Sequence, residues 1–144
     1  MNFEISDWHA LFIHFPIALL SIGFLFDLLG TYYKKESLLH GGWWCMVAGI
    51  FAFLPAVISG LYDDLKIGGD GHLHLPTSLI DFFTTHALIE ILVILIVIPL
   101  FYIRILNHSQ LPEKYSHKLL YFFIVGLSIL LMFFGSYLGG EFRH

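Results

Sequence analysis

The chain has 144 residues, of which 58% are apolar and only 12% charged, and its formal net charge is −4. A soluble domain carries about twice this share of charged residues, so the composition predicts an integral membrane protein. The small net charge argues against a nucleic-acid partner, and the single cysteine, Cys45, excludes an intrachain disulfide or a Cys-rich metal cluster.

Four apolar segments follow one another along the chain, and each approaches the ~20 residues that a transmembrane helix needs. They are Leu11–Leu29, Gly42–Leu61, Phe82–Ile103 and Leu119–Leu138. Backbone polar groups in lipid must be satisfied within each segment, so all are predicted to be helices. The first is too long, and its acidic leader too poor in Lys and Arg, for a cleaved signal peptide. We therefore expect an all-α fold in which residues 1–144 form a single transmembrane four-helix bundle.

The basic residues predict the orientation, since Lys and Arg accumulate in short cytoplasmic loops. Five of the seven are assigned to the first and third connections: Lys34, Lys35, Arg104, Lys114 and Lys118. Both termini are therefore expected on the outer, periplasmic side of a bacterial inner membrane. Aromatic residues at the segment ends, with Tyr121 among them, match the interfacial belts of such helices.

Two of the nine histidines, His14 and His86, lie inside apolar segments that are almost free of charge. An ionisable side chain at membrane depth is costly, so it marks a candidate functional site. In the predicted orientation, six histidines fall on the outer half or the outer surface: His9, His14, His72, His74, His86 and His144.

A haem site is the first interpretation of the intramembrane pair. The first and third helices run in the same direction, so His14 and His86 at similar depth can face each other across the bundle core. Two neutral imidazoles are a usual axial pair for a b-type haem, and His9 and His144 are candidates for a second haem. Gly135 and Gly139 in the last helix form a small-xxx-small pattern, which allows a flat macrocycle or another helix to approach closely.

Two alternatives use the same residues. Glu90 lies four residues after His86 on one helical face, so His14, His86 and Glu90 could bind a transition-metal ion such as iron, copper or zinc. The outer histidines His9, His72, His74 and His144 would then form an entry path or a second site. In the other alternative, the polar residues only fix helix register in a structural or assembly subunit of a larger complex.

The chain resembles the DUF2231 family of predicted four-helix membrane proteins. The resemblance rests on His9–Leu19 (HALFIHFPIAL) with the later Asp27, on Gly60 followed by Asp63 or Asp64, on His86-Ala-Leu, and on the closing Gly135–His144 (GSYLGGEFRH). The chain departs from the family pattern at Ala10, where Pro is usual, and at Glu90, where Asn is frequent. Family domains are fused to c-type cytochrome or Rieske iron–sulfur domains, which implies membrane redox chemistry at the outer face.

These observations predict a lipid-embedded b-type haem protein, for electron transfer rather than as a stand-alone enzyme. Its expected partners are quinol or a membrane complex on one side and an exported c-type cytochrome or other redox protein on the other. A homodimer or a place in a larger complex is compatible with the sequence. No catalytic triad, P-loop or dinucleotide-binding fingerprint is present.

Overall fold

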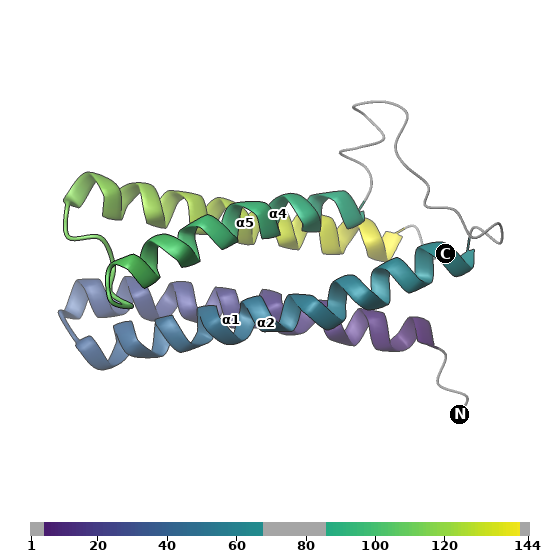
Figure 1. Cartoon of the computed structure of the whole chain (residues 1–144), viewed down its shortest axis with the longest axis horizontal. Helices are drawn as coiled ribbons and strands as arrows, with labels where there is room; N and C mark the ends of the chain where they lie inside the picture. The colour runs from purple at the N-terminus through teal and green to yellow at the C-terminus, as the bar shows by residue number, and fades with distance from the viewer. Residues whose placement is uncertain (1–4, 68–85, 142–144) are drawn as a thin grey trace.

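The computed structural model describes the backbone of residues 5–67 and 86–141, and side-chain environments for 12–59 and 88–137. The described chain forms four helices and no strand (Figure 1). They are α1 (Ile5–Tyr33), α2 (Glu36–Ile67), α4 (His86–Leu106) and α5 (Tyr115–Glu141). Each is long and apolar enough to cross a membrane, so the predicted all-α, four-span fold is confirmed. Residues 82–85 of the predicted third segment lie outside the described range.

The first two helices form a tight hairpin. Lys34 adopts a left-handed backbone conformation with φ of 54°, and the Lys35 amide donates a hydrogen bond to the Gly30 carbonyl over 3.0 Å. These features end α1 and let α2 begin at Glu36. Glycines bring the two backbones together, since a Cβ built on Gly23 would lie 3.2 Å from the carbonyl oxygen of Gly42.

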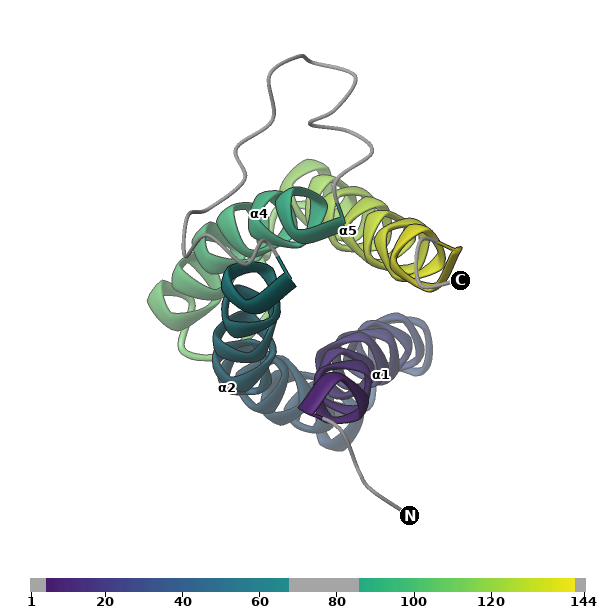
Figure 2. The same ribbon diagram turned by 90° about the vertical axis from the view of Figure 1, so that its right-hand side faces the viewer.

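The other two helices form a second hairpin, and the four follow one another in the order α1, α2, α4, α5 around an arc (Figure 2). The main contacts join neighbours in this order and also join α1 to α5. The α1–α5 contact includes an edge-to-face pair of Phe24 and Phe122, whose ring centroids are 6.0 Å apart. The side chains that meet between the helices are mostly aliphatic, for example Leu20, Val93 and Val125.

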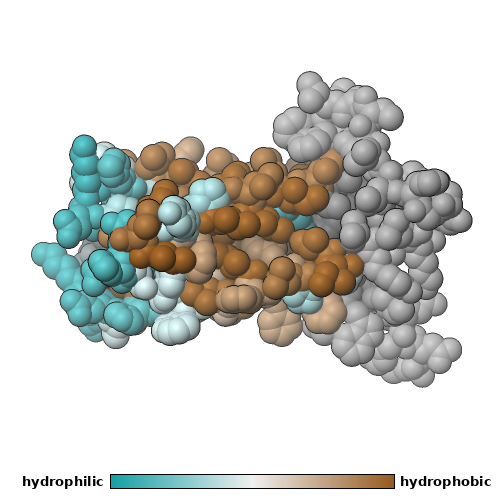
Figure 3. Space-filling view, viewed as in Figure 1, coloured by the Kyte–Doolittle hydropathy of each residue, from teal (hydrophilic) through white to brown (hydrophobic). Residues whose placement is uncertain are grey.

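The middle of the described surface is an apolar belt, whereas the end that carries the α1–α2 and α4–α5 connections is hydrophilic (Figure 3). Large apolar side chains such as Phe51, Leu95 and Leu130 are exposed on this belt. A soluble protein would bury such a surface, and a bilayer covers it with hydrocarbon. The chain is therefore a multi-pass membrane protein.

The close packing of α1 on α2 can be tested by adding one methyl group. A Cβ at Gly30 would lie 3.0 Å from the backbone nitrogen of Leu39 and 2.8 Å from its Cδ2 atom, so the helices would have to separate. We expect Gly30→Ala to destabilise the protein by about 1–3 kcal/mol, the range for overpacking. Thermal unfolding in detergent measures the change.

Gly126→Ala is the matched control, because its Cβ would meet only the Phe24 ring, at 3.5 Å from Cζ and 4.0 Å from Cε2, which are ordinary contacts. A melting temperature that falls equally in both variants would contradict close α1–α2 packing at Gly30.

Candidate functional site

A buried ionic cluster joins all four helices near the end that carries the two short connections. Its centre is Arg104 of α4, whose side chain is fully buried and forms a two-pronged ion pair with Asp27 of α1. The Nη1 and Nη2 atoms donate hydrogen bonds to Oδ2 and Oδ1 of Asp27 over 2.6 and 2.9 Å. This fork geometry is the strongest form of a carboxylate–guanidinium contact.

The other hydrogen bonds of the cluster use the remaining donors of Arg104. Nη1 also donates to the hydroxyl of Tyr121 in α5 over 3.1 Å, and Nη2 donates to the Leu39 carbonyl of α2 over 2.9 Å. Nε donates to the Ser109 carbonyl over 3.1 Å, and the Tyr121 hydroxyl donates to Asp27 Oδ2 over 2.9 Å. A guanidinium has five N–H donors, and here each of them has a partner.

The end of α4 is built around this side chain. His108 and Ser109 have left-handed backbone conformations, with φ of 54° and 68°. They turn the chain so that the Ser109 amide donates to the Arg104 carbonyl over 2.9 Å, while the Ser109 carbonyl accepts from Nε. The guanidinium also lies 5.7 Å from the ring centre of Trp43, which in turn stacks on Phe101. The aromatic rings therefore stabilise the positive charge of the guanidinium and help to exclude water from it.

This cluster was not anticipated from the sequence. Arg104 was assigned to the cytoplasmic connection, but it is a buried residue of α4, because its charge is compensated by Asp27. Tyr121 was assigned to an interfacial belt, but it is buried, because its hydroxyl belongs to the ion pair. Asp27 near the end of an apolar segment was the available signal, since a carboxylate at membrane depth needs a partner. With every donor of Arg104 used, the cluster holds helices together and offers no free guanidinium donor to a ligand.

His14 lies on the opposite half of α1, and its side chain is exposed. Ile13 and Ile17 occupy the core-facing positions at this level. Thirteen residues separate His14 from the buried Asp27, which at ~100° per residue places the two side chains about 140° apart around the helix. His14 therefore lies on a flank of α1 outside the bundle core, and not on the core face where it was expected.

The same flank of α1 carries Ser21, seven residues further along the helix. Its Oγ atom is buried and has no hydrogen-bond partner in the described structure. Residues seven apart lie on one face of a helix, so the imidazole and this hydroxyl share a face.

His86 is the first residue of α4, at the same end of the bundle as His14. The contact of Gly42 with Asp27 and the stacking of Trp43 on Phe101 set a common level on α1, α2 and α4. His14 lies thirteen residues before Asp27 in α1, and position 88 lies thirteen residues before Phe101 in α4. At ~1.5 Å per residue, His86 is therefore only about 3 Å further from this level than His14 is. The described side chains do not include that of His86.

Glu90 is buried, with 7% of its surface exposed. It shares a face of α4 with Ile94 and Val97, four and seven residues later, and both of these line a groove against α2. His14, in contrast, lies on the side of α1 away from the glycine contacts with α2. Among the residues whose side chains are described, no three His, Cys, Asp or Glu groups lie close enough to hold a metal ion.

The other predicted site residues lie toward the end of the bundle opposite the two short connections. Gly135 is buried in α5, and Gly139 is one turn further along the same helix. His9 is in the first turns of α1, in the part without described side chains, and His144 lies outside the described residues. The structure thus places the backbones of His9, His14, His86, Gly135 and Gly139 in the half of the bundle opposite the two short connections.

Comparison with known proteins identifies a family. The family model described as "Predicted membrane protein (DUF2231)" matches residues 7–143, which is nearly the whole chain. No curated protein and no solved structure matches the chain.

The ion pair can be tested by removing one partner. Arg104→Ala would leave the buried Asp27 carboxylate without its counter-ion. We expect a loss of about 3–5 kcal/mol, because an uncompensated buried charge is far more costly than a lost surface charge. Thermal unfolding in detergent and the yield of folded protein are the measurements.

Lys114→Ala is the matched control, because it removes a positive charge from an exposed residue near the start of α5. The double variant Asp27→Leu with Arg104→Met should lose less stability than the sum of the two single changes. Additive losses would show that the two side chains do not stabilise each other.

Proposed function

Because the chain belongs to the DUF2231 family of predicted membrane proteins, and its outer half carries histidines at membrane depth, we propose that it binds a b-type haem there and transfers electrons. His14 is the proposed first axial ligand and His86 the second. When bound, the haem would supply one-electron redox chemistry.

The exposed imidazole of His14 is the observation that carries this proposal. It is the third residue of the candidate membrane span Phe12–Tyr33, and its exposed side chain lies on the outside of the bundle near the end of this span. A polar group left without a partner there costs free energy. Coordination to iron would give the imidazole nitrogen a partner, and the macrocycle would cover an apolar helix flank.

The levels of the two histidines support His86 as the second ligand. The α1 and α4 helices run in the same direction, and the two residues differ by less than one helical turn in depth, about 3 Å. The buried Ile13 and Ile17 fill the core face of α1 at this level, so the proposed haem belongs on the flank of α1 and not in the centre of the bundle. We also propose that Gly135 and Gly139 of α5 allow the haem macrocycle to approach this helix closely.

The position of Glu90 distinguishes the haem proposal from the alternative of a metal ion held by three side chains. Its buried side chain lies on the face of α4 that turns toward α2, whereas His14 is exposed on the side of α1 away from α2. A haem needs only the two imidazoles, so we favour haem over a non-haem ion held by His14, His86 and Glu90. A second haem on His9 and His144 would double the haem content per chain.

One observation also favours a second candidate, a subunit of a larger membrane complex without a redox role. An exposed histidine on a transmembrane helix can equally be covered by a partner helix, which would supply the hydrogen bond. A protein that purifies without colour or metal but together with other membrane subunits would support this candidate.

The haem proposal predicts a visible spectrum. Purified protein should show a Soret band and, after reduction with dithionite, the sharp bands of low-spin b-type haem. His14→Ala and His86→Ala should each abolish or strongly shift the spectrum, because each removes one iron ligand. Absorption spectra and haem content per chain are the measurements.

His40→Ala and His117→Ala serve as controls, since both residues are exposed near the connections at the other end of the bundle. A complete low-spin spectrum in both His14→Ala and His86→Ala would exclude this ligand pair.

The proposed partners depend on the orientation in the membrane. Lys34, Lys35 and Lys114 are exposed at the end of the bundle opposite His14, as the positive-inside rule requires if that end is cytoplasmic. We therefore place the proposed haem on the periplasmic side of a bacterial inner membrane. There it would receive electrons from quinol or a membrane complex and pass them to an exported c-type cytochrome.

Cysteine labelling in intact cells tests this orientation. In a Cys45→Ala background, Ser37→Cys should resist a membrane-impermeant thiol reagent, because Ser37 is exposed at the end assigned to the cytoplasm. Ser6→Cys and Asp70→Cys should react. The reverse labelling pattern would mean that the histidines lie on the cytoplasmic side, which would exclude the exported partner. It would not contradict His14 and His86 as the haem ligands.

A further inference from the structure

Lysines with free ammonium groups gather at the hydrophilic end of the bundle, which carries the two short connections (Figure 3). Lys34 and Lys35 are exposed between α1 and α2, and Lys114 is exposed directly before α5. In the described part of the chain, the ammonium groups of these lysines and of Lys118 form no ion pair and no hydrogen bond. They differ in this from Arg104, whose donors are all used, so they are available to a ligand.

The same end is positively charged, although the whole chain carries a net charge of −4. Residues 34–40 and 107–118 contain four lysines and two acidic residues, Glu36 and Glu113, so their formal net charge is +2. The rest of the chain, in which Asp27 neutralises Arg104, therefore carries −6. An anionic ligand is attracted to this end and repelled by the remainder of the molecule.

Exposed tyrosines indicate where this end lies relative to the bilayer. Tyr32 and Tyr33 directly precede Lys34, and Tyr115 directly follows Lys114. The three tyrosines are 79%, 59% and 79% exposed. Tyrosine rings on transmembrane helices gather at the level of the lipid headgroups. The neighbouring lysines therefore lie within reach of lipid phosphate groups.

We propose that Lys34, Lys35 and Lys114 bind the headgroups of anionic phospholipids in the leaflet that surrounds this end. The phosphate of such a lipid carries a negative charge that an ammonium group neutralises through a charge-assisted hydrogen bond. A zwitterionic headgroup also brings a positive charge, which the lysines repel. Phosphatidylglycerol is therefore expected to bind in preference to phosphatidylcholine.

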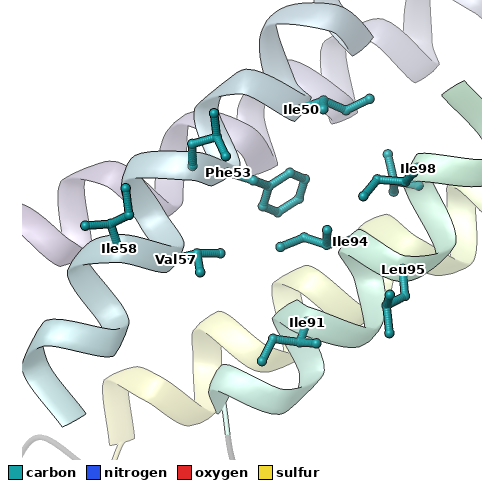
Figure 4. A pocket seen from close by; sticks show the side chains of 10 residues that line it. Ile50, Phe53, Val57, Ile58, Ile91, Ile94, Leu95 and Ile98 are labelled. Carbon is teal, nitrogen blue, oxygen red and sulfur yellow. The ribbon is translucent and has the colours of Figure 1, made fainter. Parts of the chain in front are cut away.

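The apolar groove between α2 and α4 cannot bind such a headgroup. Phe53 and Ile94 point toward each other across it (Figure 4). Its lining residues are aliphatic apart from Phe53, and none of them has a charged or hydrogen-bonding side chain. Preference for an anionic headgroup must therefore come from the lysines at the end with the connections.

Native mass spectrometry and thermal unfolding in mild detergent test the proposal, with phosphatidylglycerol and phosphatidylcholine of identical acyl chains as probes. Wild-type protein should retain more phosphatidylglycerol, and only this lipid should raise its melting temperature. Both effects should weaken at high salt, because ions screen exposed charges.

The triple variant Lys34→Gln, Lys35→Gln and Lys114→Gln should bind phosphatidylglycerol roughly a hundredfold more weakly, because each lysine at an anionic lipid surface contributes about fivefold in affinity. The triple variant with arginine at the same positions keeps the charge and should bind as the wild type does. Helical content by circular dichroism should be unchanged in both, since the three residues are exposed.

Lys66→Gln with Arg143→Gln is the matched control, because these basic residues lie in the remainder of the chain and not at the end with the connections. This variant should retain phosphatidylglycerol as the wild type does.

Three results would overturn the inference: equal retention of the two lipids by the wild type, unchanged retention of phosphatidylglycerol by the glutamine variant, or an equal rise in melting temperature with inorganic phosphate alone. The last result would show that the lysines take a free anion and not a headgroup. None of these outcomes depends on a haem spectrum, so the lipid site and the haem proposal can fail separately.

Discussion

The guanidinium of Arg104 is the group on which the arrangement of the helices depends. It is a charge at full burial, and burial of a charge is tolerated only when a counter-ion and hydrogen bonds replace the water. Asp27 supplies the counter-ion from α1, Tyr121 a hydroxyl from α5, and Leu39 a carbonyl from α2. In a bilayer, where apolar surfaces gain little from associating, such polar contacts and close glycine packing decide which helices are neighbours.

This interaction makes the two ends of the bundle different. The end with the short connections is held by an ion pair, aromatic stacking and glycine contacts. The described part of the other half is held mainly by aliphatic contacts, with an apolar groove between α2 and α4. Ligand sites need space and adaptable walls, and the proposed haem site falls in the half that the ion pair does not constrain.

Much of the fold could be predicted from the sequence, because apolar length alone identifies a transmembrane helix. The pairing of Asp27 with Arg104 could not, since 77 residues separate them and no local pattern encodes which distant charges meet. Arg104 at a segment end has the same sequence signature whether it faces a loop or a buried carboxylate. The position of His14 outside the bundle core, however, could have been predicted from the sequence. If Asp27 lies on the core face of its helix, helical periodicity places His14 on a different face. The side-chain position of His86 depends on contacts that a single sequence does not specify.

The separation of Asp27 and Arg104 along the chain has a consequence for biogenesis. During synthesis the α1–α2 hairpin precedes α4, so Asp27 is made 77 residues before its counter-ion. A lone aspartate in a transmembrane helix disfavours membrane insertion, by about 2.5–3.5 kcal/mol at the helix centre and by less toward the helix end, where Asp27 lies. The strongly apolar remainder of α1 must compensate for this insertion cost until α4 has been inserted. Only then does the Asp27 carboxylate gain Arg104 as its partner. A chain truncated between the hairpins would therefore carry an Asp27 carboxylate within the membrane-spanning part of α1 without its Arg104 counter-ion.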